Sequence, residues 1–131
     1  MNKEFVTYEQ SLALKELGFN DYCYRGYDKN QMLFYSEQES GHLLNYSVGM
    51  NVSAPLKQQV FRWFREKYEL GHTICPYYFN ANITELQDVD DYPLQHEVYV
   101  SSPFTYEEAE NACIDKLIEI AKQQDNDTNP K

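Results

Sequence analysis

The stretch Ser53–Gly71, SAPLKQQVFRWFREKYELG, decides how the rest of the chain is interpreted. At about 100° of rotation per residue, its apolar side chains fall on one broad arc of a helix and its polar side chains fall on the opposite arc. The apolar arc contains Leu56, Val60, Phe61, Trp63, Phe64 and Tyr68, and the polar arc contains Gln58, Arg62, Arg65 and Glu66. The pattern predicts a helix that buries an aromatic face, with Ser53 as its N-cap, Pro55 in its first turn and Gly71 at its end.

Two more helices are predicted from their starting signals. Thr7-Tyr8-Glu9-Gln10 places a capping threonine three residues before a glutamine, and Thr105-Tyr106-Glu107-Glu108 repeats the arrangement with a glutamate. We expect the first helix to end near Leu17, with Gly18 in the left-handed conformation. The second should run to about Gln124 and be the most buried helix, because apolar residues cover more than half of its circumference.

Short aromatic and aliphatic runs between these helices predict strands. The predicted strands are Tyr22–Tyr24, Met32–Tyr35, Leu43–Val48, Thr73–Phe79 and His96–Ser101, and residues 80–95 are predicted to form an acidic loop. The resulting order, α-βββ-α-ββ-α, predicts an α+β protein in which an antiparallel sheet of about four to five short strands carries three helices mainly on one face. We expect a single globular domain over residues 1–124 and a flexible polar tail over residues 125–131.

The composition limits the classes of partner. Acidic residues outnumber basic ones by 21 to 11 in a chain of 131 residues, which gives a formal net charge of -10. Such a charge repels nucleic acid and anionic membranes, so direct nucleic-acid binding is disfavoured. No apolar run approaches the length that spans a bilayer, and the start lacks the apolar core of a signal peptide, so we expect a cytoplasmic protein with no membrane association.

No residue pattern assigns a catalytic, cofactor-binding or metal-binding role. His72-x-x-Cys75 offers two ligands, whereas a zinc site requires about four. Cys113 lies on the apolar arc of its helix, where a nucleophilic thiolate is not expected. A small metal- or thiol-dependent enzyme therefore stays an alternative, and no cofactor is expected.

Two surface features are candidates for binding a partner. On the central helix, Arg62, Trp63 and Arg65 could contact an acidic or aromatic partner, or form a solvated face neutralised by Glu66 and Glu69. The second feature is an acidic surface that could imitate the phosphates of a nucleic acid and inhibit a host defence factor. Its candidate residues are Asp88, Asp90, Asp91, Glu108, Asp115 and Glu119.

Three segments resemble a family of small uncharacterised proteins encoded by bacteriophages and mobile elements of gut bacteria. They begin at Phe5-Val6-Thr7-Tyr8, at Ser53-Ala54-Pro55-Leu56 and at Thr105-Tyr106-Glu107-Glu108. The resemblance implies a protein of phage or mobile-element origin and brings no known activity. Together these observations predict a small acidic protein that binds a host protein, with self-association left open.

Overall fold

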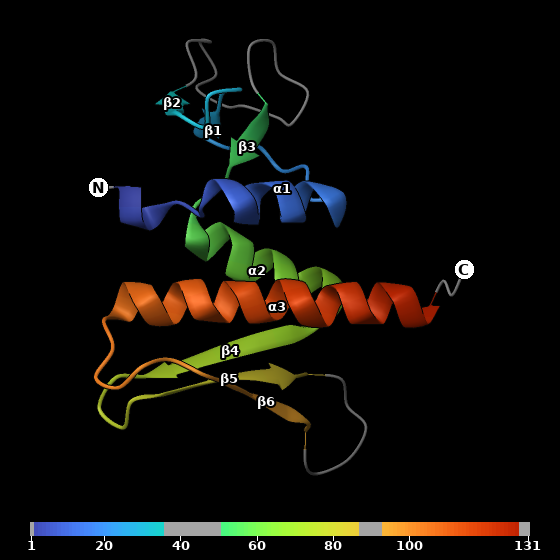
Figure 1. Cartoon of the computed structure of the whole chain (residues 1–131). Coiled ribbons are helices and arrows are strands. Elements are labelled where there is room, and N and C mark those ends of the chain that lie inside the picture. The colour runs from blue at the N-terminus through green and yellow to red at the C-terminus, as the bar shows by residue number, and fades with distance from the viewer. Residues whose placement is uncertain (1, 36–50, 87–92, 129–131) are drawn as a thin grey trace. The chain divides into compact units, whose positions relative to one another are not determined.

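The computed structural model describes residues 2–35, 51–86 and 93–128, which form two compact units, Met1–Lys57 and Gln58–Lys131 (Figure 1). The described residues contain three α-helices and two antiparallel sheets of three strands each. The predicted α+β class is therefore confirmed, although the strands form two sheets rather than one. The organisation of residues 1–124 as a single domain stays a prediction.

The first unit contains a short 3-10 helix, Asn2–Glu4, followed by helix α1, Tyr8–Glu16. Its sheet has the order β2-β1-β3, with β1 spanning Arg25–Tyr27, β2 Leu33–Tyr35 and β3 Val52–Ala54. The predicted capping box is present, because the Gln10 N–H donates to Thr7 Oγ1 and the Thr7 N–H donates to Gln10 Oε1. Gly18 has a φ of 98°, as predicted for the end of this helix. Of the predicted strands in this unit, Tyr22–Tyr24 is replaced by β1, and Leu43–Val48 lies outside the described residues.

The predicted helix start at Ser53 is wrong. Val52–Ala54 is a fully buried strand, and Ser53 pairs with Gly26 of β1. The Pro55 carbonyl accepts a hydrogen bond from the Val6 N–H at 3.1 Å. Helix α2 begins only at Lys57. The small side chains of Ser53 and Ala54 fit a buried strand that pairs with β1. This tertiary pairing outweighs the local preference of Ser53 for a helix N-cap.

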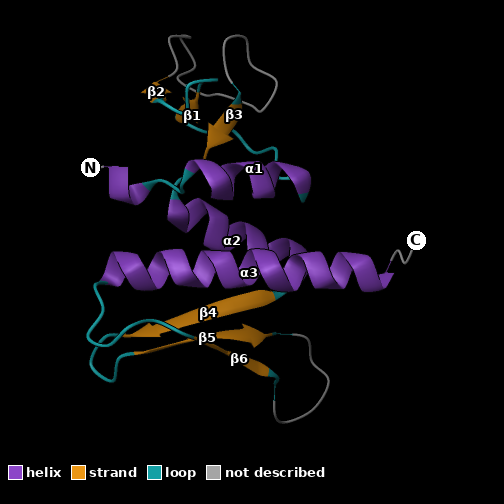
Figure 2. Cartoon of the chain, viewed as in Figure 1, coloured by secondary structure: helices purple, strands orange, loops and turns teal. Residues whose placement is uncertain are grey.

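The second unit contains most of α2, Lys57–Tyr68, and a sheet of order β4-β5-β6, followed by helix α3, Tyr106–Thr128 (Figure 2). Strand β4 spans Leu70–Cys75, β5 spans Asn80–Glu85 and β6 spans Gln95–Val98. Ile83, in the central strand, pairs with His72 on one side and His96 on the other. Because side chains alternate between the two faces of a sheet, these three residues share a face.

Helices α2 and α3 both contact this face of the sheet. Helix α3 contacts all three strands, and Phe61 of α2 stacks on His72 of β4. The core predicted from the spacing is confirmed, since Val60, Phe64 and Leu117 are each at most 1% exposed. The opposite face carries mainly polar side chains. They include Thr73, Asn82, Thr84, Gln95 and Glu97.

Three element boundaries differ from the predictions. Helix α2 ends before Glu69, which takes the left-handed conformation with a φ of 55°, whereas Gly71 lies within β4. A Cβ at Gly71 would meet the Leu86 side chain at 3.3 Å, so the glycine admits this close contact. Part of the predicted loop is strand β5, because residues 80–85 pair with β4 and residues 81–84 also pair with β6. The predicted strand Thr73–Phe79 instead ends at Cys75, and a turn follows.

Helix α3 continues through Thr128, beyond its predicted end at Gln124. Residues 125–128 of the predicted flexible tail are therefore helical, and residues 129–131 lie outside the described part of the chain. A hydrogen bond from the Tyr68 hydroxyl to Asp125 Oδ2, 3.0 Å long, joins this last turn to α2. This contact is a tertiary interaction that the local polar composition does not reveal.

Candidate binding groove beside strand β6

The predicted basic contact surface is not assembled as one patch. Arg62 and Arg65 are exposed and Trp63 is half-buried. Arg65 follows Trp63 by two residues, so the two side chains point roughly 160° apart around the helix axis. The cation that lies over the Trp63 ring is instead Lys67, with its Nζ 4.9 Å from the ring centroid.

The expected neutralisation of the two arginines does not appear either. In residues 2–35, 51–86 and 93–128, no ion pair joins Arg62 to Glu66 or Arg65 to Glu69. Glu69 cannot continue the helical spacing, because its backbone is left-handed. The role of Arg62, Trp63 and Arg65 as partner contacts stays a prediction.

The predicted acidic surface is divided. Asp88, Asp90 and Asp91 lie outside the described residues. The carboxylate of Glu108 accepts hydrogen bonds from the Thr105 backbone N–H at 3.2 Å and from its hydroxyl at 2.9 Å, so Glu108 caps α3. Asp115 and Glu119 are exposed one turn apart on α3, and both border a groove that the sequence did not reveal.

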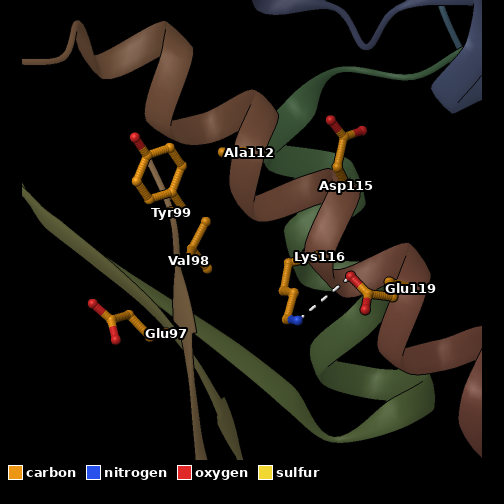
Figure 3. A pocket seen from close by; sticks show the side chains of 7 residues that line it. All are labelled: Glu97, Val98, Tyr99, Ala112, Asp115, Lys116 and Glu119. Atoms are coloured by element: carbon orange, nitrogen blue, oxygen red, sulfur yellow. Dashed lines mark hydrogen bonds and ion pairs between the residues drawn. The ribbon is translucent and has the colours of Figure 1, made fainter. Parts of the chain in front are cut away.

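This groove lies between β6 and α3 and has a volume of about 360 Å³ (Figure 3). Its lining from the β6 segment is Glu97, Val98 and Tyr99, and its lining from α3 is Ala112, Asp115, Lys116 and Glu119. Figure 3 shows the Lys116 side chain extending to Glu119, where its Nζ lies 3.4 Å from Oε2. The lining thus contains three carboxylate residues and one ammonium, which is already paired with Glu119, so the groove is acidic.

Exposed aromatic side chains occur in the segment after β6 and in the turn between β4 and β5. Tyr99 is 89% exposed, and Tyr77, in the turn between β4 and β5, is 83% exposed. In the same turn, Phe79 packs edge-on against Phe104, with ring centroids 5.7 Å apart. The chain contains twelve tyrosines, and no local pattern in the sequence indicates which of them are exposed.

Two of the groups that suggested an enzyme, Cys113 and His72, lie in surroundings that shift their pKa values. Burial and the nearby Glu110 raise the pKa of the Cys113 thiol to about 12, so this cysteine stays protonated at neutral pH. His72 lies in β4 against Phe61, and burial followed by the charge of Arg65 lowers its pKa. Among the described residues, no three side chains of His, Cys, Asp or Glu are grouped closely enough to hold a metal ion.

The described part of the chain has no helix with the length and apolar character needed to cross a bilayer. No protein-family model matches the chain, and neither a curated protein nor a solved structure matches it. The fold and the site therefore define an α+β protein with an acidic, aromatic-flanked groove at the edge of a sheet.

Proposed function

We propose that this chain is a cytoplasmic protein-binding module that holds a basic segment of a partner protein in the groove between β6 and α3. The single observation that supports this function is the groove itself, whose lining contains Glu97, Asp115 and Glu119 and only one lysine, which is paired with Glu119. The resemblance to proteins of bacteriophages and mobile elements favours a host protein as the partner.

The chemistry of the groove favours a cationic side chain. A guanidinium or ammonium placed near Glu97 gains a charge-assisted hydrogen bond, and the neighbouring Tyr99 ring offers a face for a cation–π contact. An arginine would satisfy both partners, because it is planar and carries five N–H donors. Repulsion by the same carboxylates would exclude acidic segments and nucleic acid.

Binding is a better explanation of the groove than catalysis. Its lining contains no histidine, cysteine or serine, and its one lysine is paired with Glu119, so these common nucleophiles are absent from it. The acidic nucleic-acid mimic stays a separate prediction, since Glu108 is used as a cap and only Asp115 and Glu119 of its described residues lie together.

The proposal is tested by selecting peptides from a randomised library on the full-length chain and mapping the best binder by NMR. We expect selected peptides to be enriched in arginine and lysine, and to shift the amide signals of β6 and of α3 around Ala112 and Lys116. Ala112→Trp, which fills the groove, should abolish the shifts. Lys122→Trp places the same side chain at an exposed position of α3 outside the lining and should not.

Selection of acidic peptides, or of peptides whose shifts map away from the groove, would contradict the proposed function. Retained binding by Ala112→Trp would contradict it equally, provided that the variant keeps the amide spectrum of a folded protein.

A further inference from the structure

We propose that the groove takes its partner by strand addition, in which an extended basic segment pairs with the outer edge of β6. The inference rests on the proposed function, because it specifies how the same groove binds. Strand β6 is an edge strand of the order β4-β5-β6, and within the described residues no strand pairs with its outer side. An edge strand presents backbone donors and acceptors to any extended chain.

The backbone register identifies the atoms that would bind. The Glu85 N–H donates to the Leu94 carbonyl at 2.8 Å, so this pair is a hydrogen-bonded pair of the antiparallel ladder. Hydrogen-bonded and non-bonded pairs alternate along such a ladder. His96 and Val98, which pair with Ile83 and Ala81, therefore direct their backbone groups towards β5.

By the same alternation, Gln95 and Glu97 direct their N–H and C=O groups away from β5. Glu97 is also part of the lining of the groove, so an outward-facing donor and acceptor lie at the groove itself. The second ladder agrees with this register. The Leu86 N–H, just after β5, donates to the Glu69 carbonyl at 2.7 Å, so the backbone groups of the preceding residue, Glu85, face β6.

The side chains on the two faces of the sheet set the chemistry of the partner. On the face that packs against the helices, an added strand would meet Val98 and Ala112, which accept small apolar side chains. On the opposite face it would lie beside Glu97, and an opposite charge directly across a strand pair is stabilising. The segment we propose therefore alternates apolar and basic residues over four positions, the length of β6.

A second copy of this chain fits the edge less well. Pairing two β6 edges would bring two copies of Glu97 onto one ribbon with no lysine or arginine in either strand to neutralise them. Charge complementarity therefore selects a basic partner rather than the chain itself.

Amide hydrogen exchange of the full-length chain tests the pairing, with the selected basic peptide as the probe. At a peptide concentration of about ten times Kd, the outward amides of Gln95 and Glu97 should exchange about tenfold more slowly. The inward amides of His96 and Val98 are the internal controls, and their exchange should change far less. N-methylation of one peptide residue at a time should abolish binding at every second residue and leave binding intact at the residues between. The reason is that only every second N–H of the peptide faces β6.

A charge variant tests the chemistry of the pairing. Glu97→Lys should weaken binding of the peptide at least about tenfold, whereas Glu66→Lys makes the same change on the exposed side of α2 and should have little effect. Glu97→Gln, which keeps the backbone N–H and removes the charge, should reduce affinity by less and retain the exchange pattern.

The outcomes separate the two proposals. Peptide binding in the groove without slowed exchange at Gln95 and Glu97 would overturn strand addition and leave the proposed function standing. Absence of any basic binder in the groove would overturn both. Slowed exchange that depends on protein concentration without peptide would show that a second copy pairs with β6, and would overturn the basic partner.

Discussion

The imidazole of His72 lies flat on the ring of Phe61, with ring centroids 3.6 Å apart and planes within 9°. The contact joins the face of β4 to the buried side of α2. Burial in this contact, with a further contribution from the positive charge of Arg65, lowers the pKa of His72 below 6.5. The neutral imidazole is therefore the form that the fold favours.

We predict that the pKa of His72, measured by NMR of its imidazole signals, is below that of an exposed histidine and rises in Arg65→Gln. Removing the guanidinium removes the smaller cause of the shift and leaves burial, so the rise should be partial. Arg62→Gln is the matched control, because Arg62 is not among the causes of the shift. An equal rise in both variants would indicate a general effect of net charge.

The same shift predicts how stability depends on pH. Because the pKa of His72 is lower in the folded state than in the unfolded state, the unfolded chain binds more protons between the two values. The free energy of unfolding should therefore fall as the pH drops below about 6.5, until the folded pKa is passed. Denaturant unfolding at several pH values should show a smaller loss over this window in His72→Phe than in the wild-type chain.

Helices were better predicted from the sequence than strands, and the reason is local chemistry. Thr7 and Thr105 satisfy N–H groups three residues away, so a few adjacent letters contain the whole signal. Ser53 carries the same signal but lies in β3, because its pairing with Gly26 depends on a residue far away in the sequence. Local capping signals thus identify a helix start only where no strand competes for the segment.

The residues of the groove could likewise be predicted only where a local pattern places them. Asp115 and Glu119 could be placed on one side of α3 because helical periodicity is visible in the sequence. Glu97 and Tyr99 could not be added to them, because the groove exists only after β6 has paired with β5 beside α3. Helical periodicity likewise places Arg62 and Arg65 on the arc opposite Trp63, and their role as partner contacts stays a prediction.

The core of the second unit should be sensitive to truncation at Phe64. This side chain is 0% exposed and contacts the rings of Trp63 and Tyr68. Phe64→Ala should lower the free energy of unfolding by about 3–5 kcal/mol, measured by urea or guanidinium unfolding. Glu66→Ala, at an exposed position of the same helix, should change it by less than about 0.5 kcal/mol. Similar losses in both variants would show that Phe64 is not part of a packed core.

The cap of α3 should contribute a measurable share of stability. The Glu108 N–H donates to Thr105 Oγ1 at 3.1 Å, and the Glu108 carboxylate accepts from Thr105 in return. Thr105→Ala should lower the free energy of unfolding by about 1 kcal/mol, whereas Thr105→Ser, which keeps the hydroxyl, should lose much less. Equal effects of the two substitutions would rule out the hydroxyl as the stabilising group.

The contact between the last turn of α3 and helix α2 can be tested through one hydrogen bond. In it, the Tyr68 hydroxyl donates to Asp125 Oδ2 at 3.0 Å. Burial, the hydrogen bond and the negative charge of Asp125 raise the pKa of Tyr68 to about 12. Since the folded pKa exceeds the unfolded value of 10.0, this stabilisation is complete below pH 10 and is lost as the pH rises through 12.

Asp125→Asn keeps an acceptor and removes the charge, so it should lower the pKa of Tyr68 part of the way towards 10, measured by the ultraviolet absorbance of tyrosinate. Asp125→Ala removes the acceptor as well and should lower this pKa further, with a loss of about 1 kcal/mol in the free energy of unfolding at neutral pH. The neighbouring Asp127→Ala should leave Tyr68 unchanged, because Asp127 is not among the causes of its shift. If residues 125–128 were instead a flexible tail, all three variants would titrate like the wild-type chain.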